Sequence, residues 1–103
     1  MSDLDFVVEA IKKTLKPEKI ILFGSYARGD NKEDSDFDLA VLKKKHPEHG
    51  EIAQVSRYLY KNGYDWNVSP DIHLFSEKEF NTRLRNNSFF IREIMKGKII
   101  YEN

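Results

Sequence analysis

The sequence predicts a mixed α/β (α+β) fold in which helices pack against a small group of β-strands. The first residues have apolar side chains at helical spacing, and short runs rich in β-branched residues follow them. The expected order of elements is helix, strand, strand, helix, strand, helices. The 103 residues have room for one hydrophobic core. We therefore expect a single domain over residues 1–103.

The first predicted element is an amphipathic helix over about residues 3–16. Its apolar positions recur at helical spacing, and Pro17 ends it because proline cannot continue the hydrogen-bond pattern. These positions are Leu4, Val7, Val8, Ile11 and Leu15. The apolar run at residues 20–23, bounded by Lys19 and Gly24, then predicts a buried strand.

A second strand and a second helix are expected in the middle of the chain. Residues 36–43 first alternate and then become apolar, which predicts a strand with its apolar side chains on one side. The helix is expected between Pro47 and Asn62, where Asn62-Gly63 provides a left-handed stop. Its apolar stripe consists of Ile52, Val55 and Leu59.

The last third of the chain predicts a strand, two helical stretches and a final strand. Residues 68–75 form the third strand, and Pro70 indicates an edge strand or a strand start. Ser76 and Glu79 have capping-box spacing, so a helix should begin there. Residues 86–88 interrupt it before helical spacing resumes, and residues 99–101 are expected to add a last strand.

Composition excludes several classes of protein. Lys and Arg number 17 against 17 Asp and Glu, so the net charge gives no global field for nucleic acid, and we do not expect nucleic-acid binding. No cysteine is present, which excludes disulfides and thiolate metal ligands. The longest apolar runs are too short to cross a membrane, and the default expectation is a cytoplasmic protein.

The most informative segment is Gly24-Ser25-Tyr26-Ala27-Arg28-Gly29, directly after the first strand. A glycine and a small hydroxyl at a strand-to-helix turn let backbone amides approach a phosphate. Arg28 is a candidate donor for the same anion, and the alternative interpretation is a solvated helix residue. The segment has neither the lysine of a P-loop nor the glycine spacing of a dinucleotide site.

Two carboxylates follow this turn within one short loop. Because strand side chains alternate, Asp36 and Asp38 are expected on one face, with Cα atoms roughly 6.5 to 7 Å apart. Paired carboxylates repel unless a cation neutralises them, and Mg²⁺ is the natural candidate. Asp71 can join them if its strand neighbours the second one, and Asp65 is a rival for that third position. His73 is interpreted as a packed core residue rather than a base or ligand.

An anion-binding turn, two metal-binding carboxylates and a third nearby acid are the equipment for phosphoryl or nucleotidyl transfer. At these residues the chain resembles the nucleotidyltransferase superfamily that includes DNA polymerase beta, and within it the minimal nucleotidyltransferase (MNT) proteins. The family motif is Gly-Ser, a turn with Ala-Arg-Gly, and then Ser-Asp-x-Asp. The matching residues are Gly24, Ser25, Ala27, Arg28, Gly29, Ser35, Asp36 and Asp38.

The resemblance implies a nucleotidyltransferase fold, with a small mixed sheet flanked by helices. It implies ATP as the donor, a site of two Mg²⁺ ions at Asp36 and Asp38 with Asp71 as the third acid, and a triphosphate held by Gly24 and Ser25. It also implies an antitoxin whose partner is an all-helical HEPN ribonuclease, with AMP transferred to a tyrosine of that toxin.

A second class of function is a binding module that neutralises its partner by covering it. This alternative is motivated by the short chain, because a nucleotide site on it must be completed by residues of a partner or of another copy of the chain. An antibiotic-modifying nucleotidyltransferase is a third interpretation, but it normally needs an added substrate-binding domain.

Overall fold

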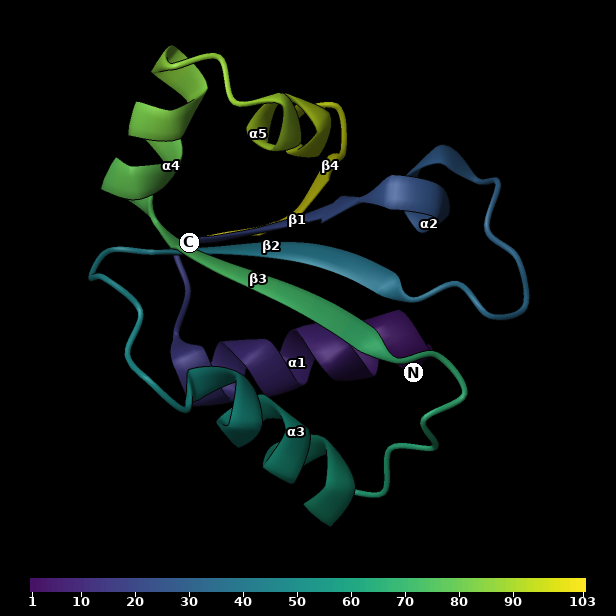
Figure 1. The fold of residues 1–103 in the computed structure, drawn as a ribbon. Helices are drawn as coiled ribbons and strands as arrows, with labels where there is room; N and C mark the ends of the chain where they lie inside the picture. The colour runs from purple at the N-terminus through teal and green to yellow at the C-terminus, as the bar shows by residue number, and fades with distance from the viewer.

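A four-stranded sheet lies between two layers of helices in the computed structural model, which describes all 103 residues (Figure 1). The strand order is β3-β2-β1-β4. In chain order the elements are α1 (Asp3–Leu15), β1 (Lys19–Phe23), α2 (Gly24–Arg28), β2 (Phe37–Lys43), α3 (Glu51–Lys61), β3 (Pro70–Ser76), α4 (Glu77–Arg85), α5 (Phe89–Met95) and β4 (Lys98–Glu102). This confirms the predicted fold class. The predicted elements occur in the expected order, but the short helix α2 between β1 and β2 was not in that order.

The sheet is mixed, because β1 pairs antiparallel with β2 and β4 while β2 pairs parallel with β3. A parallel pair cannot be joined by a tight hairpin, and α3 provides the crossover between β2 and β3. Strand β3 lies at one edge and begins at Pro70. Both expectations for this proline, a strand start and an edge strand, are confirmed.

Helices α1 and α3 cover one face of the sheet, and α4 and α5 cover the other (Figure 1). Strand β2 is buried on both sides: Leu39 and Val41 face the α1/α3 core, while Ala40 and Leu42 face the α4/α5 core. Burying one such branched side chain contributes about 1.5 to 3 kcal/mol. The single core expected from the sequence is therefore divided by the sheet into two clusters, and the central strands β1 and β2 contribute side chains to both.

The ends of the helices follow the signals in the sequence. Helix α1 begins after Ser2, whose hydroxyl accepts a hydrogen bond from the Asp5 amide at 3.1 Å, and ends at Lys16 in the left-handed region. The Ser76 hydroxyl accepts from the Glu79 amide at 3.0 Å and begins α4. None of the helices has the length and apolar character needed to cross a membrane.

One predicted core position is wrong. Ile52 is 44% exposed, whereas Val55 and Leu59 are fully buried. Glu51 takes the inward position in the first turn of α3, because its carboxylate accepts hydrogen bonds from Lys43 Nζ and from the Glu48 amide. The buried stripe therefore begins at position 51, and position 52 turns to solvent.

Candidate functional site

Two of the predicted acids, Asp38 and Asp71, meet near the end of β1, where β2 and β3 begin. Phe23 at the end of β1 is opposite Asp38 in β2, and Asp38 is directly opposite Asp71 in β3. All three lie on the face of the sheet that α4 and α5 cover, because Ala40, two residues beyond Asp38, belongs to that core. The sheet register thus brings together two carboxylates that are 33 positions apart in the chain.

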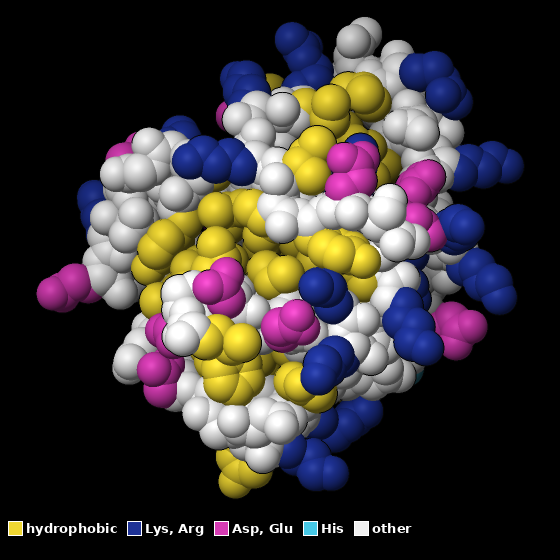
Figure 2. All heavy atoms as spheres, turned by 180° about the vertical axis from the view of Figure 1, so that it is seen from behind, with side chains coloured by type: hydrophobic (Ala, Val, Ile, Leu, Met, Phe, Trp, Pro, Cys, Tyr) yellow, Lys and Arg dark blue, Asp and Glu magenta, His cyan; other side chains and the backbone are white.

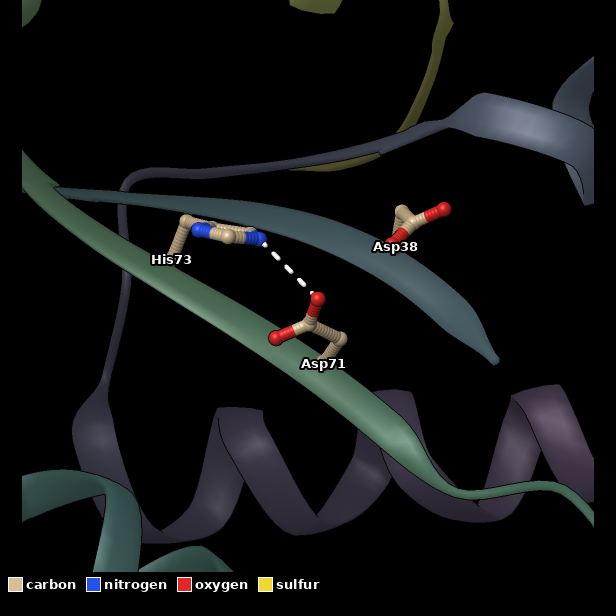
Figure 3. A group of neighbouring side chains, drawn as sticks. All are labelled: Asp38, Asp71 and His73. Carbon is tan, nitrogen blue, oxygen red and sulfur yellow. Dashed lines mark ion pairs between the residues drawn. The ribbon is translucent and has the colours of Figure 1, made fainter. Parts of the chain in front are cut away.

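Asp38, Asp71 and His73 form a cluster of metal-ligating side chains (Figure 3). One donor atom from each residue lies within 4.8 Å of the others. His73 Nε2 lies 3.3 Å from Asp71 Oδ2. These three residues are called the acid–imidazole cluster below.

Gly24 brings the backbone directly against this cluster. Its φ of +74° is in the left-handed region, and a Cβ at this position would lie 2.2 Å from Asp38 Oδ2. Both the backbone conformation and the closeness of the carboxylate therefore require glycine. The predicted anion-binding turn and the acids form one continuous site.

The electrostatics of the cluster favour a cation. Burial raises the pKa of Asp38 above its usual value, and the nearby Asp71 carboxylate raises it further. The charges of His73 and Arg28 act in the opposite direction. Negative charge is costly at Asp38 without a counter-ion, and two carboxylates are suitable donors for a hard divalent cation.

The acid that lies beside Asp38 is Asp71, not Asp65. Asp65 lies in the loop after α3, where its carboxylate accepts a hydrogen bond from the Asn67 amide at 3.0 Å. Asp36 also lies outside the cluster, exposed and one residue before β2. Its charge still contributes to the raised pKa of Asp38.

The remaining predicted residues lie in α2. Ser25 is partly buried near the start of this short helix, and the exposed Arg28 forms an ion pair with Asp30, with Nε 3.1 Å from Oδ2. Gly24 and Arg28 line a hollow of about 50 Å³ together with residues of α5 and the turn after it. The residues lining the hollow are Gly24, Ala27, Arg28, Glu93, Lys96 and Gly97.

Two residues that lie beside the predicted site residues were not predicted to lie there. His73 was interpreted as a core residue, and it does pack against Phe23 and Phe90, but its imidazole also reaches the acids. The available signal was its position two residues after Asp71, which places both side chains on one strand face. The sequence around Lys96 does not indicate that this residue lies beside Gly24, because only the fold brings the end of α5 to that position.

Comparison with known proteins finds a family match over nearly the whole chain. The model of the family described as polymerase beta, nucleotidyltransferase matches residues 5–103. A relative from Methanocaldococcus jannaschii, described as a candidate protein adenylyltransferase, is 47% identical over 62 residues, which are 56% of this chain and 61% of that protein. A second such protein from the same organism is 36% identical over 84 residues, covering 82% of this chain and 78% of the relative.

Solved structures share the fold at lower sequence identity. A crystal structure of a toxin-antitoxin with AMP-PNP has a TM-score of 0.63 and 21% identity, covering 100% of this chain and 75% of the other. A mutant of the toxin-antitoxin MntA-HpeT has a TM-score of 0.62 and 18% identity, with the same coverage. At this identity the likeness establishes the fold.

Proposed function

Because the chain belongs to the polymerase beta nucleotidyltransferase family, we propose that it transfers a nucleoside monophosphate from a nucleoside triphosphate to a hydroxyl group. The observation that carries the proposal is the pairing of Asp38 with Asp71 across β2 and β3, directly beside Gly24. This arrangement combines a cation site with a turn that a phosphate can approach closely. Both are needed for chemistry at a polyphosphate.

A divalent cation, Mg²⁺ in our proposal, fits the residues present. Asp38 and Asp71 would hold it, and Asp36, the exposed residue directly before β2, would be a further ligand. When bound, the cation neutralises charge on the phosphate oxygens. The raised pKa of Asp38 agrees with this assignment, because burial and the Asp71 carboxylate raise the pKa more than His73 and Arg28 lower it.

The chain's own residues would then perform three tasks. The Gly24 and Ser25 backbone and the Ser25 hydroxyl bind the β and γ phosphates, and Arg28 offsets their charge. The acceptor oxygen attacks the α phosphorus, a new P–O bond forms, and the bond to the bridging oxygen breaks to release pyrophosphate. The hydroxyl proton passes to the Asp71 carboxylate, which is 52% exposed and therefore accessible to an incoming acceptor.

We assign ATP as the donor and a tyrosine of an all-helical HEPN toxin as the acceptor, which gives the chain an antitoxin role in the cytoplasm. The names of the archaeal relatives support AMP transfer to a protein. The toxin-antitoxin structures with the same fold support a toxin partner and an adenine nucleotide. A second copy of this chain is the alternative to the toxin partner for supplying the residues that enclose the nucleotide.

The test is incubation of the chain with its co-purifying partner, Mg²⁺ and ATP labelled at the α phosphate. Label should appear on the partner with the wild-type chain and disappear with the Asp36→Asn, Asp38→Asn double variant. Replacing Asp34, an exposed acid of the same loop, by Asn provides a matched control that should leave transfer unchanged. Transfer that survives in the double variant would contradict the catalytic assignment.

Neutralisation by covering the partner is the second candidate function. The openness of the site favours it, because Asp71 is half exposed and the adjoining hollow has a volume of about 50 Å³, too small for a nucleotide. Growth of cells expressing the partner toxin separates the two functions. Protection that is complete with the double variant indicates covering, and protection that is lost with it indicates catalysis.

A further inference from the structure

We propose that His73 is itself a ligand of the divalent cation, so that the site combines imidazole nitrogen with carboxylate oxygen and selects Mn²⁺ over Mg²⁺ more strongly than carboxylates alone would. This inference deepens the proposed function and rests on its assignment of a cation to Asp38 and Asp71. The sequence motif does not include a histidine. The donor set comes from the geometry of this chain.

The distances suit a shared coordination shell. His73 Nε2 and Asp71 Oδ2 are 3.3 Å apart, and donor atoms of Asp38, Asp71 and His73 lie within 4.8 Å of one another. Adjacent ligands at right angles around an ion, each about 2.1 to 2.2 Å from it, are separated by roughly 3 Å. The three side chains can therefore reach one ion with small adjustments.

The fold fixes the imidazole in this position. His73 lies directly opposite Ala40 in β2, and the small alanine side chain leaves space for the ring to lie over that strand toward Asp38 (Figure 3). The rings of Phe23 and Phe90 pack against His73, with centroids 5.7 and 5.1 Å away. A ring held by two aromatic neighbours loses little further freedom when it binds a metal.

The chemistry of the donors sets the selectivity. Mg²⁺ prefers oxygen ligands and keeps several waters, whereas imidazole suits the first-row transition metals. A nitrogen ligand should therefore strengthen Mn²⁺ binding far more than Mg²⁺ binding. The competing role for His73 is to hold the Asp71 carboxylate in place, which would affect both ions equally.

Pulsed electron paramagnetic resonance of the Mn²⁺-loaded chain distinguishes these roles, because a directly bound imidazole produces nitrogen couplings to the metal spin. We expect such couplings in the wild-type chain and their loss in His73→Gln. The chain has two other histidines, His46 and His49, in the loop after β2. The His46→Gln, His49→Gln double variant is the matched control and should keep the couplings.

Metal affinities measured by calorimetry provide the second readout. His73→Gln should weaken Mn²⁺ binding at least about 10-fold and change Mg²⁺ binding less than about 3-fold. Bound Mn²⁺ without nitrogen coupling, or an equal loss for both ions, would overturn the proposal. So would couplings that vanish in the His46/His49 variant.

An AMP-transfer assay on the same samples separates this inference from the proposed function. Transfer that depends on Asp38, without nitrogen ligation, would refute the role of His73 and leave the enzyme assignment standing. Nitrogen ligation without any AMP transfer would support His73 as a metal ligand and refute the enzyme assignment.

Discussion

At the scale of single residues, the site depends on a glycine that touches a carboxylate. Gly24 has a left-handed backbone, and a methyl group in its place would overlap Asp38 Oδ2. The chain contains other glycines with the same backbone requirement but open surroundings, such as Gly63 at φ +80°. Gly63 therefore serves as the control for a substitution at Gly24.

Gly63→Ala should lower the free energy of unfolding by about 1 kcal/mol, the cost of a positive φ for alanine. Gly24→Ala should lower it by more, because its methyl group also overlaps the Asp38 carboxylate. Only Gly24→Ala should also reduce AMP transfer, by roughly 100-fold, because it displaces the Asp38 carboxylate. Urea unfolding and the transfer assay measure the two effects. Equal transfer rates in the two variants would show that contact with Asp38 does not matter for the reaction.

The Lys43–Glu51 pair is the second residue-scale feature, and both side chains are largely buried. Burial alone would raise the pKa of Glu51, but the hydrogen bonds from Lys43 and the Glu48 amide outweigh it, and the pKa falls below 4.5. A lowered pKa contributes stability that is present above the unfolded value and is lost as the pH falls through the folded value. The pair should thus stabilise the fold at neutral pH.

Glu51→Gln should lose about 2 kcal/mol of unfolding free energy at pH 7, because it leaves the Lys43 charge without its partner. The difference from the wild type should shrink as the pH falls below 4.5. Glu9→Gln, which removes an exposed pair with Lys12, should change stability by less than about 0.5 kcal/mol. A Glu51→Gln deficit that stays constant down to pH 3 would contradict the assigned pKa direction.

At the scale of secondary-structure elements, the helices are bounded by local signals. Ser76 is 8% exposed and links the end of β3 to the start of α4 through its hydrogen bond with the Glu79 amide. Because β3 also carries Asp71 and His73, this junction positions the strand that supplies two of the three residues of the acid–imidazole cluster. The cap can be tested separately from the site residues.

Ser76→Ala should destabilise the chain by about 1 kcal/mol, and Ser76→Asp should retain most of the stability because aspartate also caps helices. Thermal unfolding followed by circular dichroism measures both. If the two variants lose the same stability, the hydroxyl contributes through packing rather than capping.

Element types and order were predictable because each has a local cause, whereas contacts between elements were not. Pro17 and Asn62-Gly63 end helices through their own backbone preferences, and Pro70 restricts β3 to an edge. The inward turn of Glu51 depends on Lys43 from another element, so the periodicity of α3 could not reveal it. The position of Asp71 beside Asp38 was predictable only on the condition that β3 neighbours β2, which the fold satisfies.

At the scale of the whole molecule, the sheet separates the α1/α3 core from the α4/α5 core. The candidate site lies at one edge of the α4/α5 core. The face seen from behind carries acidic and basic side chains interspersed with exposed hydrophobic ones (Figure 2). Met95 and Ile99 are among the large hydrophobic residues that remain more than half exposed. The mixture of charges on this face agrees with the net charge of zero.

Amide hydrogen exchange should reflect the strand order. Amides of β1 and β2, which lie between the two cores, should exchange only through global unfolding, while those of the edge strands β3 and β4 exchange faster. Exchange measured by NMR gives the opening free energy of each strand. Slower exchange in β3 than in β1 would be inconsistent with the observed sheet.

The most direct test of the proposed activity is to follow the α and γ phosphates of ATP separately. Nucleotidyl transfer predicts that label from the α phosphate remains on the partner protein and that label from the γ phosphate leaves with pyrophosphate. Transfer should persist in Asp65→Asn and fall by roughly 1,000-fold in Asp71→Asn. Label from the γ phosphate on the partner, or full α transfer by Asp71→Asn, would contradict the account.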